Sequence, residues 1–129
     1  MAVSVLTNIT NDVRAGKFTA TVTAAATAGA SSVFCGFTPS KVTLQQTGGT
    51  PDATWFSQWI KGMTAGYQVA VGNTGAGTIA TTNGITVFDG SEADRTDQAT
   101  NSPLSGGQGF LLGSGTVANN IVYHVVAER

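Results

Sequence analysis

Short runs in which apolar and polar residues alternate fill most of the chain. In the segment from Lys17 to Ala26, KFTATVTAAA, threonines alternate with Phe18, Ala20 and Val22. A period of two residues is that of a half-buried β-strand. No window keeps the 3.6-residue period of an amphipathic helix. The pattern therefore predicts strands here, although the alanines alone favour a helix.

Similar runs recur between turns rich in glycine, asparagine, proline and threonine. With 17–26, the expected strands are 32–38, 41–46, 55–60, 67–71, 78–81, 85–88, 109–112 and 121–127. Short strands at such spacing are typical of sandwiches and barrels. A chain of 129 residues suits one domain. We predict an all-β protein, a single compact β-sandwich or small barrel of about eight to nine short strands spanning residues 1–129.

Both ends of the chain and one loop stand apart from this pattern. The apolar run from Ala2 to Leu6 is either a first strand or part of an N-terminal arm, residues 1–15, that pairs with a neighbouring subunit. The last run, 121–127, is largely apolar on both faces, which predicts a strand that is central in a sheet or covered by a neighbour. Residues 89–107 form the longest stretch without periodicity, and loops of that length are usually functional, docked or mobile.

Charge is scarce along the whole chain. Charged residues make up 10% and the net charge is −1, against about 25% charged residues in typical domains. Nucleic acids and anionic membranes are bound by clustered lysine and arginine, so we expect neither as a partner. We also expect no secretion signal and no membrane span. Monomeric soluble proteins carry more charge, so the deficit favours a component of an assembly.

Catalytic chemistry finds little support in the sequence. His124 is the single histidine and lies in a mostly apolar strand, where a structural role is the usual one. Cys35 is the single cysteine and lies among apolar residues, which favours a small buried side chain over a reactive or interchain thiol. The 113–115 Gly-Ser-Gly segment lacks the pattern of a nucleophile elbow. We expect no enzyme and no cofactor.

Two further segments have the composition of ligand-binding loops. The run 72–77, GNTGAG, is followed by a β-like segment instead of a helix, so a hairpin turn is expected and not a phosphate loop. Four acids lie close together, namely Asp89, Glu92, Asp94 and Asp97. A calcium site is conceivable there, but the spacing is not that of an EF-hand. A solvated loop with Arg95 as counterion is the simpler interpretation, and we expect no metal.

The aromatic segment 55–60 holds both tryptophans of the chain. If it is a strand, Trp55 and Trp59 share one face with Ser57, and Phe56 lies on the other. Large aromatic side chains dominate cores and interfaces alike. Three uses remain open at this point: core packing, a subunit interface, or a platform on which a sugar stacks.

Several short motifs resemble small virion proteins of tailed bacteriophages. The matching segments, in chain order, are WFSQWIKGM, TTNGITVFDG, GFLLG and a closing YHVVAER. The similarity covers Trp59 to Arg129. It implies a capsid decoration or cement protein, made in the host cytoplasm and placed on the capsid surface of the virion. Its implied partners are the major capsid protein and further copies of itself, often as a trimer.

Contact residues follow from this resemblance and from the apolar segments. The candidates for the interface are Ala2, Val3, Val5, Leu6, Trp55, Phe56 and Trp59. The alternative function is a carbohydrate- or receptor-binding β module of a phage tail fibre or similar appendage, in which the tryptophans would be exposed.

Overall fold

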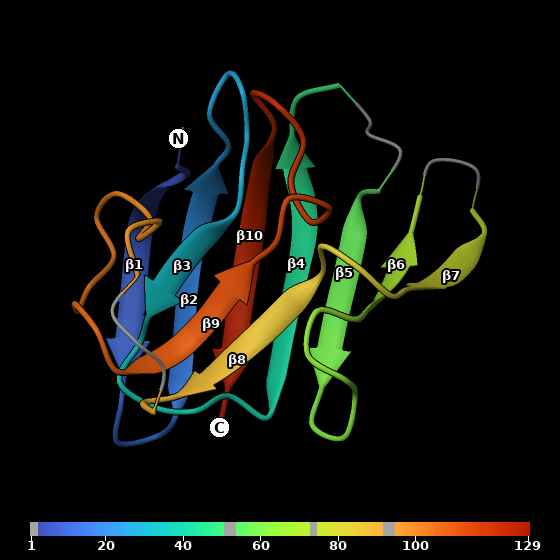
Figure 1. The fold of residues 1–129 in the computed structure, drawn as a ribbon. Coiled ribbons are helices and arrows are strands. Elements are labelled where there is room, and N and C mark those ends of the chain that lie inside the picture. Colours follow the sequence, from blue (N-terminus) through green and yellow to red (C-terminus); the bar gives the residue numbers. More distant parts are fainter. Residues whose placement is uncertain (1–2, 51–53, 73–74, 92–94) are drawn as a thin grey trace.

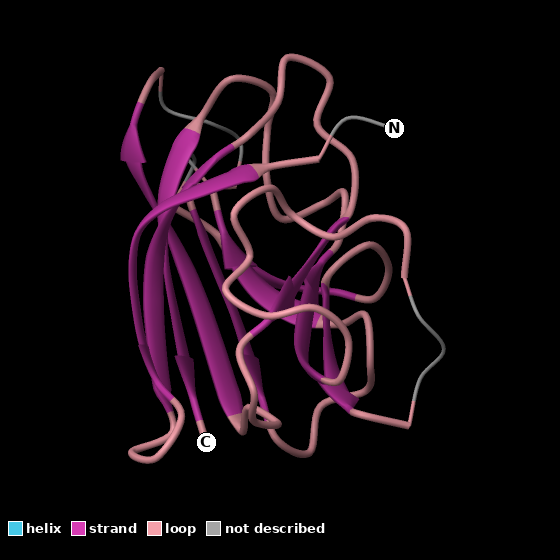
Figure 2. Ribbon diagram, turned by 90° about the vertical axis from the view of Figure 1, so that its left-hand side faces the viewer, coloured by secondary structure: helices cyan, strands magenta, loops and turns pink. Residues whose placement is uncertain are grey.

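Two antiparallel β-sheets face each other in the structure, a computed structural model that describes residues 3–50, 54–72, 75–91 and 95–129. Figure 2 shows the sheets as separate layers, with loops around the smaller one. The described residues form strands and turns but no helix. The prediction of an all-β protein is confirmed, and of the two predicted architectures, sandwich or small barrel, the structure shows the sandwich.

Within the described residues, ten strands make up the two sheets. They are β1 (Val5–Asp12), β2 (Lys17–Thr23), β3 (Ser31–Phe34), β4 (Lys41–Gly48), β5 (Phe56–Ile60), β6 (Gln68–Val71), β7 (Gly77–Ala80), β8 (Ile85–Asp89), β9 (Gln108–Leu112) and β10 (Val122–Glu128). The larger sheet has the order β1-β2-β10-β4-β5-β6-β7, and the smaller one the order β3-β9-β8 (Figure 1).

The last strand, β10, lies in the interior of the larger sheet, as its two apolar faces predicted. It pairs along its whole length with β2 on one side and β4 on the other, so that Val125 lies opposite Ala20 and Leu44. All three of these side chains are buried. Between the sheets Phe18 meets Phe110 edge-on, with ring centroids 6.0 Å apart. The core thus lies between β2, β10 and β4 and the smaller sheet.

The N-terminal segment forms strand β1 at one edge of the larger sheet. It pairs with β2, with an irregularity between Thr7 and Thr10 where Asn8 has a φ of 52°. The amide of Leu6 donates to the carbonyl of Thr100 (2.9 Å). Of the two interpretations of this segment, first strand or arm, the structure shows the strand for 5–12.

Three strands, β5, β6 and β7, extend the larger sheet beyond the region that the smaller sheet covers (Figure 1). We call these strands the wing. Its inner face continues the core-facing side of β4, because Leu44 pairs with Ser57 and Ser57 pairs with Ala70. Segments that connect the strands cover this inner face; for example, the side-chain amide of Gln68 donates to the carbonyl of Gly115 (3.3 Å). The outer face of the wing has no such cover among the described residues.

A group of glycines joins the wing to the smaller sheet. The amide of Gly84 donates to the carbonyl of Gly66, and the amide of Gly113 donates to the carbonyl of Gly84, both at 2.9 Å. A Cβ atom on Gly113 would overlap the carbonyl oxygens of Gly84 and Asn83. Backbone therefore packs directly on backbone here, which only glycine permits.

Candidate binding surfaces

The two tryptophans lie in different surroundings, and only Trp59 lies within β5. The strand alternation does not extend to Trp55, because its N–H donates to the carbonyl of Val71 in β6 while its C=O accepts from the amide of Gln46 in β4. Trp59 pairs with Val42 across β4 and β5, is 6% exposed, and belongs to the hydrophobic core. Its indole N–H donates to the carbonyl of Thr64 (3.3 Å). Trp59 therefore belongs to the core and does not provide an interface within this fold.

Trp55 stands just before β5 and is 37% exposed. Its indole N–H donates to the carbonyl of Gly72 (2.8 Å), and its ring packs edge-on against Phe56 at 6.2 Å between centroids. The hydrogen bond fixes the orientation of the ring. Part of the indole remains open to solvent, so Trp55 is the one of the two tryptophans that can contact a ligand.

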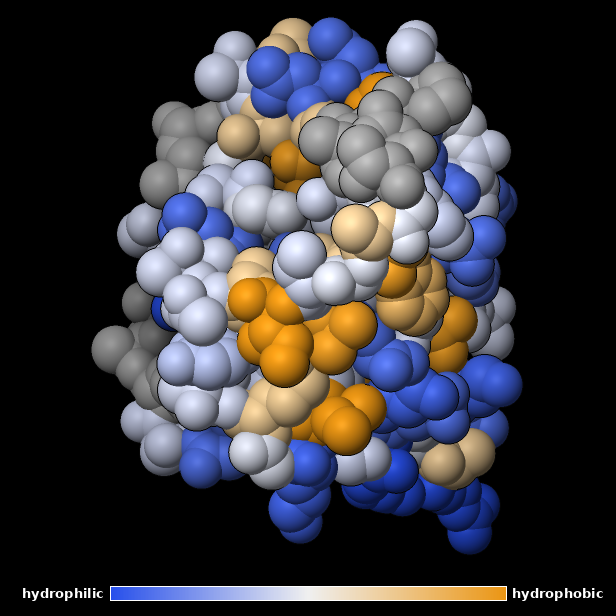
Figure 3. All heavy atoms as spheres, turned by 90° about the vertical axis from the view of Figure 1, so that its right-hand side faces the viewer, coloured by the Kyte–Doolittle hydropathy of each residue, from blue (hydrophilic) through white to orange (hydrophobic). Residues whose placement is uncertain are grey.

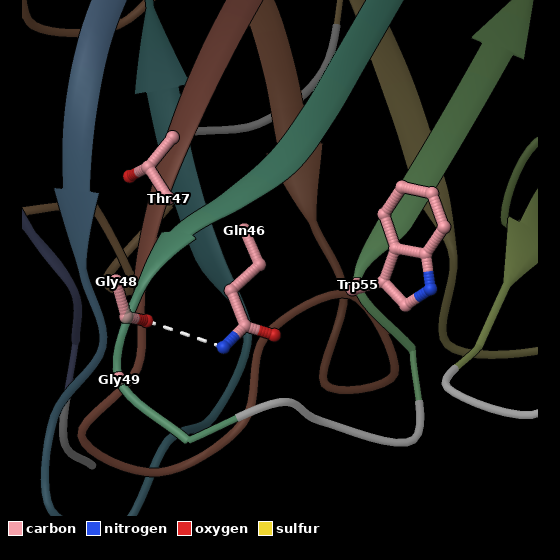
Figure 4. Close-up of a pocket in the computed structure, with 5 residues that line it drawn as sticks. All are labelled: Gln46, Thr47, Gly48, Gly49 and Trp55. Carbon is pink, nitrogen blue, oxygen red and sulfur yellow. Dashed lines mark hydrogen bonds between the residues drawn. The ribbon is translucent and has the colours of Figure 1, made fainter.

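A pocket of about 280 Å³ lies beside Trp55, lined also by Gln46, Thr47, Gly48 and Gly49. Figure 4 shows the indole on one side, the backbone of the two glycines on the other, and the Gln46 side chain between them. The Gln46 amide donates to the carbonyls of Gly48 (3.2 Å) and Thr50 (2.7 Å). An aromatic face beside amide and backbone polar groups is suited to a small polar ligand.

The outer face of the wing is mostly apolar, with Gln58 as a polar residue on it. Val69 lies opposite Ile79 across β6 and β7, and Val71 lies opposite Phe56 across β5 and β6. Ile79 is 65% exposed, and Val69 and Ile60 are exposed as well. Figure 3 shows hydrophobic residues gathered on this side of the molecule. Isolated exposed apolar residues are common, but a contiguous group marks a contact surface.

Sequence reasoning placed Tyr67, Val69 and Val71 on one face but did not identify that face as the outer one. The buried residues of β6 are Gln68 and Ala70 instead. The reason is the register, since Ala70 lies opposite the buried Ser57 and Val69 lies opposite Gln58. In the sequence, the only sign of this surface is the pair of apolar residues at Val69 and Val71.

The N-terminal candidates for interface contacts also include both buried and exposed residues. Leu6 is 1% exposed and packs in the core opposite Val22, so the expectation that it makes contacts with another subunit is wrong for this fold. Val5 is exposed and Val3 is half-buried. Ala2 lies outside the described residues. Val5 is therefore the candidate of this group that is available for contact.

The long loop is bound to the sandwich through Asp97. Its carboxylate accepts hydrogen bonds from the Ser32 hydroxyl (2.6 Å) and from the Arg95 guanidinium at 3.0 and 2.9 Å. The bonds from Arg95, and next that from Ser32, lower the pKa of Asp97 against the opposing effect of burial. Arg95 also lies over the ring of Phe88, 5.1 Å from its centroid. Asp97 therefore has a structural role, and Arg95 balances its charge.

A metal site finds no support in the parts of the loop that the structure describes. Asp89 caps its own turn by accepting from the amide (2.9 Å) and hydroxyl (2.6 Å) of Ser91. Glu92 and Asp94 lie outside the described residues. Among the described residues no group of three acids, histidines or cysteines is placed to hold a metal ion.

The two residues considered for nucleophilic or acid–base chemistry, Cys35 and His124, differ in burial. Cys35 is fully buried and its thiol donates to the carbonyl of Phe37 (3.4 Å). Burial raises the pKa of Cys35 to about 11, which suppresses the reactive thiolate. His124 is exposed on β10, between Thr21 and Gln45 of the neighbouring strands.

Comparison with protein-family models, with characterised proteins and with solved structures gives no match. Within the described part of the chain, no helix long and apolar enough to cross a membrane is present.

Proposed function

We propose that this protein is a non-enzymatic structural component of a bacteriophage virion, a decoration or cement protein that binds the outside of an assembled head. The observation that supports it best is the outer face of the wing, where Ile60, Val69 and Ile79 are exposed and Phe56 is half-buried, with no covering layer among the described residues. The choice of the major capsid protein as the partner rests on the resemblance of short sequence motifs to phage virion proteins.

Such a protein acts through binding equilibrium and needs no chemistry of its own. A molecule that binds the assembled shell, but not its separated subunits, stabilises the shell by mass action. At a free concentration of about 100 times the dissociation constant, each site contributes about 2.7 kcal/mol. A face with few charges loses little free energy to the desolvation of ions on docking.

The experiment mixes the purified protein with capsids assembled without it and measures co-sedimentation and the temperature at which the capsids disrupt. We expect binding and a raised disruption temperature. Val69→Glu places a charge on the outer face of the wing and should abolish both effects. Thr7→Glu places the same charge on exposed β1 and should leave both unchanged. Failure to bind any capsid form would overturn the proposal.

A second function, carbohydrate binding, is favoured by the Trp55 pocket alone. A sugar ring stacks on an exposed indole while its hydroxyls bond to neighbouring polar groups, here the Gln46 side chain and the backbone around Gly48. Because Trp59 is buried, a change in tryptophan fluorescence on adding glycans should come from Trp55. A signal that persists in Trp55→Phe, or no signal with any glycan, would exclude this site.

A further inference from the structure

The outer edge of β7 is the one sheet edge that the described residues leave without hydrogen bonds from another segment. Each of the other three edges is hydrogen-bonded to another segment. On β1 the amide of Leu6 donates to the carbonyl of Thr100 (2.9 Å), and on β3 the amide of Ser32 donates to the carbonyl of Asp97 (2.8 Å). On β8 the carbonyl of Phe88 accepts from the hydroxyl of Thr38 (3.2 Å). Sheet edges left open pair readily with other strands, and proteins usually block them with charges, prolines or bulges. The sequence of β7, Gly77–Ala80, has none of these, and its register with β6 is regular.

The hydrogen-bonding groups of this edge can be located from the ladder. The carbonyl of Val71 accepts from the amide of Trp55 (3.0 Å), so the backbone polar groups of Val71 face β5. Val71 lies opposite Gly77, and Val69 lies opposite Ile79. Since these groups alternate sides along a strand, Gly77 and Ile79 direct theirs away from β6. The N–H and C=O of Ile79 therefore point to the open edge.

We infer that β7 pairs with β7 of a second copy, antiparallel about a two-fold axis at Ile79, so that two larger sheets join into one. In this arrangement Ile79 and its counterpart exchange both of their backbone hydrogen bonds. Gly77 and Thr81 of the two copies then face each other, two residues on either side of the axis. Two-fold dimers are the commonest homo-oligomers, and their interfaces must be self-complementary.

The side chains around this edge favour a second copy over a different partner. A two-fold axis perpendicular to the sheet places the outer faces of both copies on the same side of the joined sheet. Ile79 and Val69 of one copy then lie next to the same residues of the other. Strands β6 and β7 carry no charged residue. Like charges therefore do not oppose self-pairing, and no charge pattern selects an acidic or basic partner. The apolar residues Val69 and Ile79 of each copy therefore lie beside apolar residues of the other.

Cross-linking tests this pairing directly on the protein alone, without a capsid. In Ile79→Cys the two introduced thiols would lie on hydrogen-bonded partners, whose Cα atoms are about 5.5 Å apart, within the range of a disulfide. The native Cys35 is fully buried and does not compete. We expect Ile79→Cys to form covalent dimers under mild oxidation. Thr10→Cys, exposed on β1 at the opposite edge of the same sheet, should not.

Sedimentation velocity from about 1 μM to about 1 mM covers the affinities of weak interfaces and gives the second measurement. The unmodified protein should form dimers as its concentration rises. Ile79→Lys should raise the dissociation constant by about tenfold or more, because two ammonium groups would face each other at the axis. Thr10→Lys adds the same charge and should have no effect, and circular dichroism confirms folding of both.

Three results would overturn the inference: a monomer at every concentration, an oligomer that Ile79→Lys leaves intact, or equal cross-linking of the two cysteine variants. Capsid binding has no part in these measurements, so their failure and that of the proposed function are separate outcomes.

Discussion

The Ser32 hydroxyl donates to the Asp97 carboxylate at 2.6 Å, across 65 positions of the sequence. The same two residues are joined by their backbones, since the Ser32 amide donates to the Asp97 carbonyl at 2.8 Å. Together these bonds hold the loop after β8 along the edge of β3. The longest aperiodic stretch of the sequence is thereby part of the sandwich.

Removing the carboxylate should release this loop. We expect Asp97→Ala to lower the free energy of unfolding by about 2 kcal/mol, because it removes the charge-assisted hydrogen bonds that the Ser32 hydroxyl and the Arg95 guanidinium donate to this carboxylate. Urea denaturation measures the change. Asp12→Ala, in which the lost carboxylate caps an exposed turn by accepting from Ala15 (3.0 Å), is the matched control and should cost less. Equal losses would contradict the role given to Asp97.

Acid should weaken the fold through the same residue. The pKa of Asp97 is lowered in the folded state, chiefly by Arg95, so the unfolded state binds this proton more readily. The stabilisation is complete above the ordinary aspartate pKa, about 3.9, and is lost as the pH falls through the lower folded value. Asp97→Asn should lack this part of the acid dependence. An unchanged slope of stability against pH in that variant would contradict the assignment.

Cys35 gives a prediction at the alkaline end. Burial raises its pKa from 9.0 to about 11, so the unfolded chain loses this proton first and stability falls as the pH rises through that window. Cys35→Ser should flatten this slope. In the native protein, a thiol reagent should react only after unfolding, and fast reaction at neutral pH would show that the thiol is accessible.

The glycine contacts between the wing and the smaller sheet should tolerate no side chain. Gly113→Ala would force a Cβ into the carbonyls of Gly84 and Asn83, and overpacking of this kind costs about 1–3 kcal/mol. Gly77→Ala is the control, because its Cβ would meet nothing closer than 4.0 Å. Thermal unfolding should show a lower Tm for Gly113→Ala than for Gly77→Ala.

The tryptophans should differ sharply in their contribution to stability. Trp59→Ala removes a core side chain and should cost about 3–5 kcal/mol. Trp55→Ala loses one hydrogen bond, to Gly72, and a partly exposed ring, which should cost about 1 kcal/mol. Denaturant midpoints measure both variants. A larger loss at Trp55 would reverse the assignment of core and surface.

Much of the fold follows from local patterns in the sequence. Threonine alternating with Phe18, Ala20 and Val22 specifies a half-buried strand, because side chains of a strand point to opposite faces in turn. The two apolar faces of the last strand indicated its central position. The alternation of Ser57 and Trp59 against Phe56 also followed from this period of two, whereas Trp55 lies before the strand.

Tertiary structure alone decided which surfaces remain open. The sequence of β6 offers Val69 and Val71 as the natural inward face, yet Gln68 and Ala70 point inward. The register of β6 is set by its hydrogen bonds to β5, and that of β5 by its hydrogen bonds to β4. A shift of one residue in this register would exchange the inward and outward faces of the strand. Likewise, Thr100 blocks the edge of β1, whereas none of the described residues pairs with the outer edge of β7. Both features depend on contacts between segments far apart in the chain, which a local pattern of hydrophobic and polar residues does not encode.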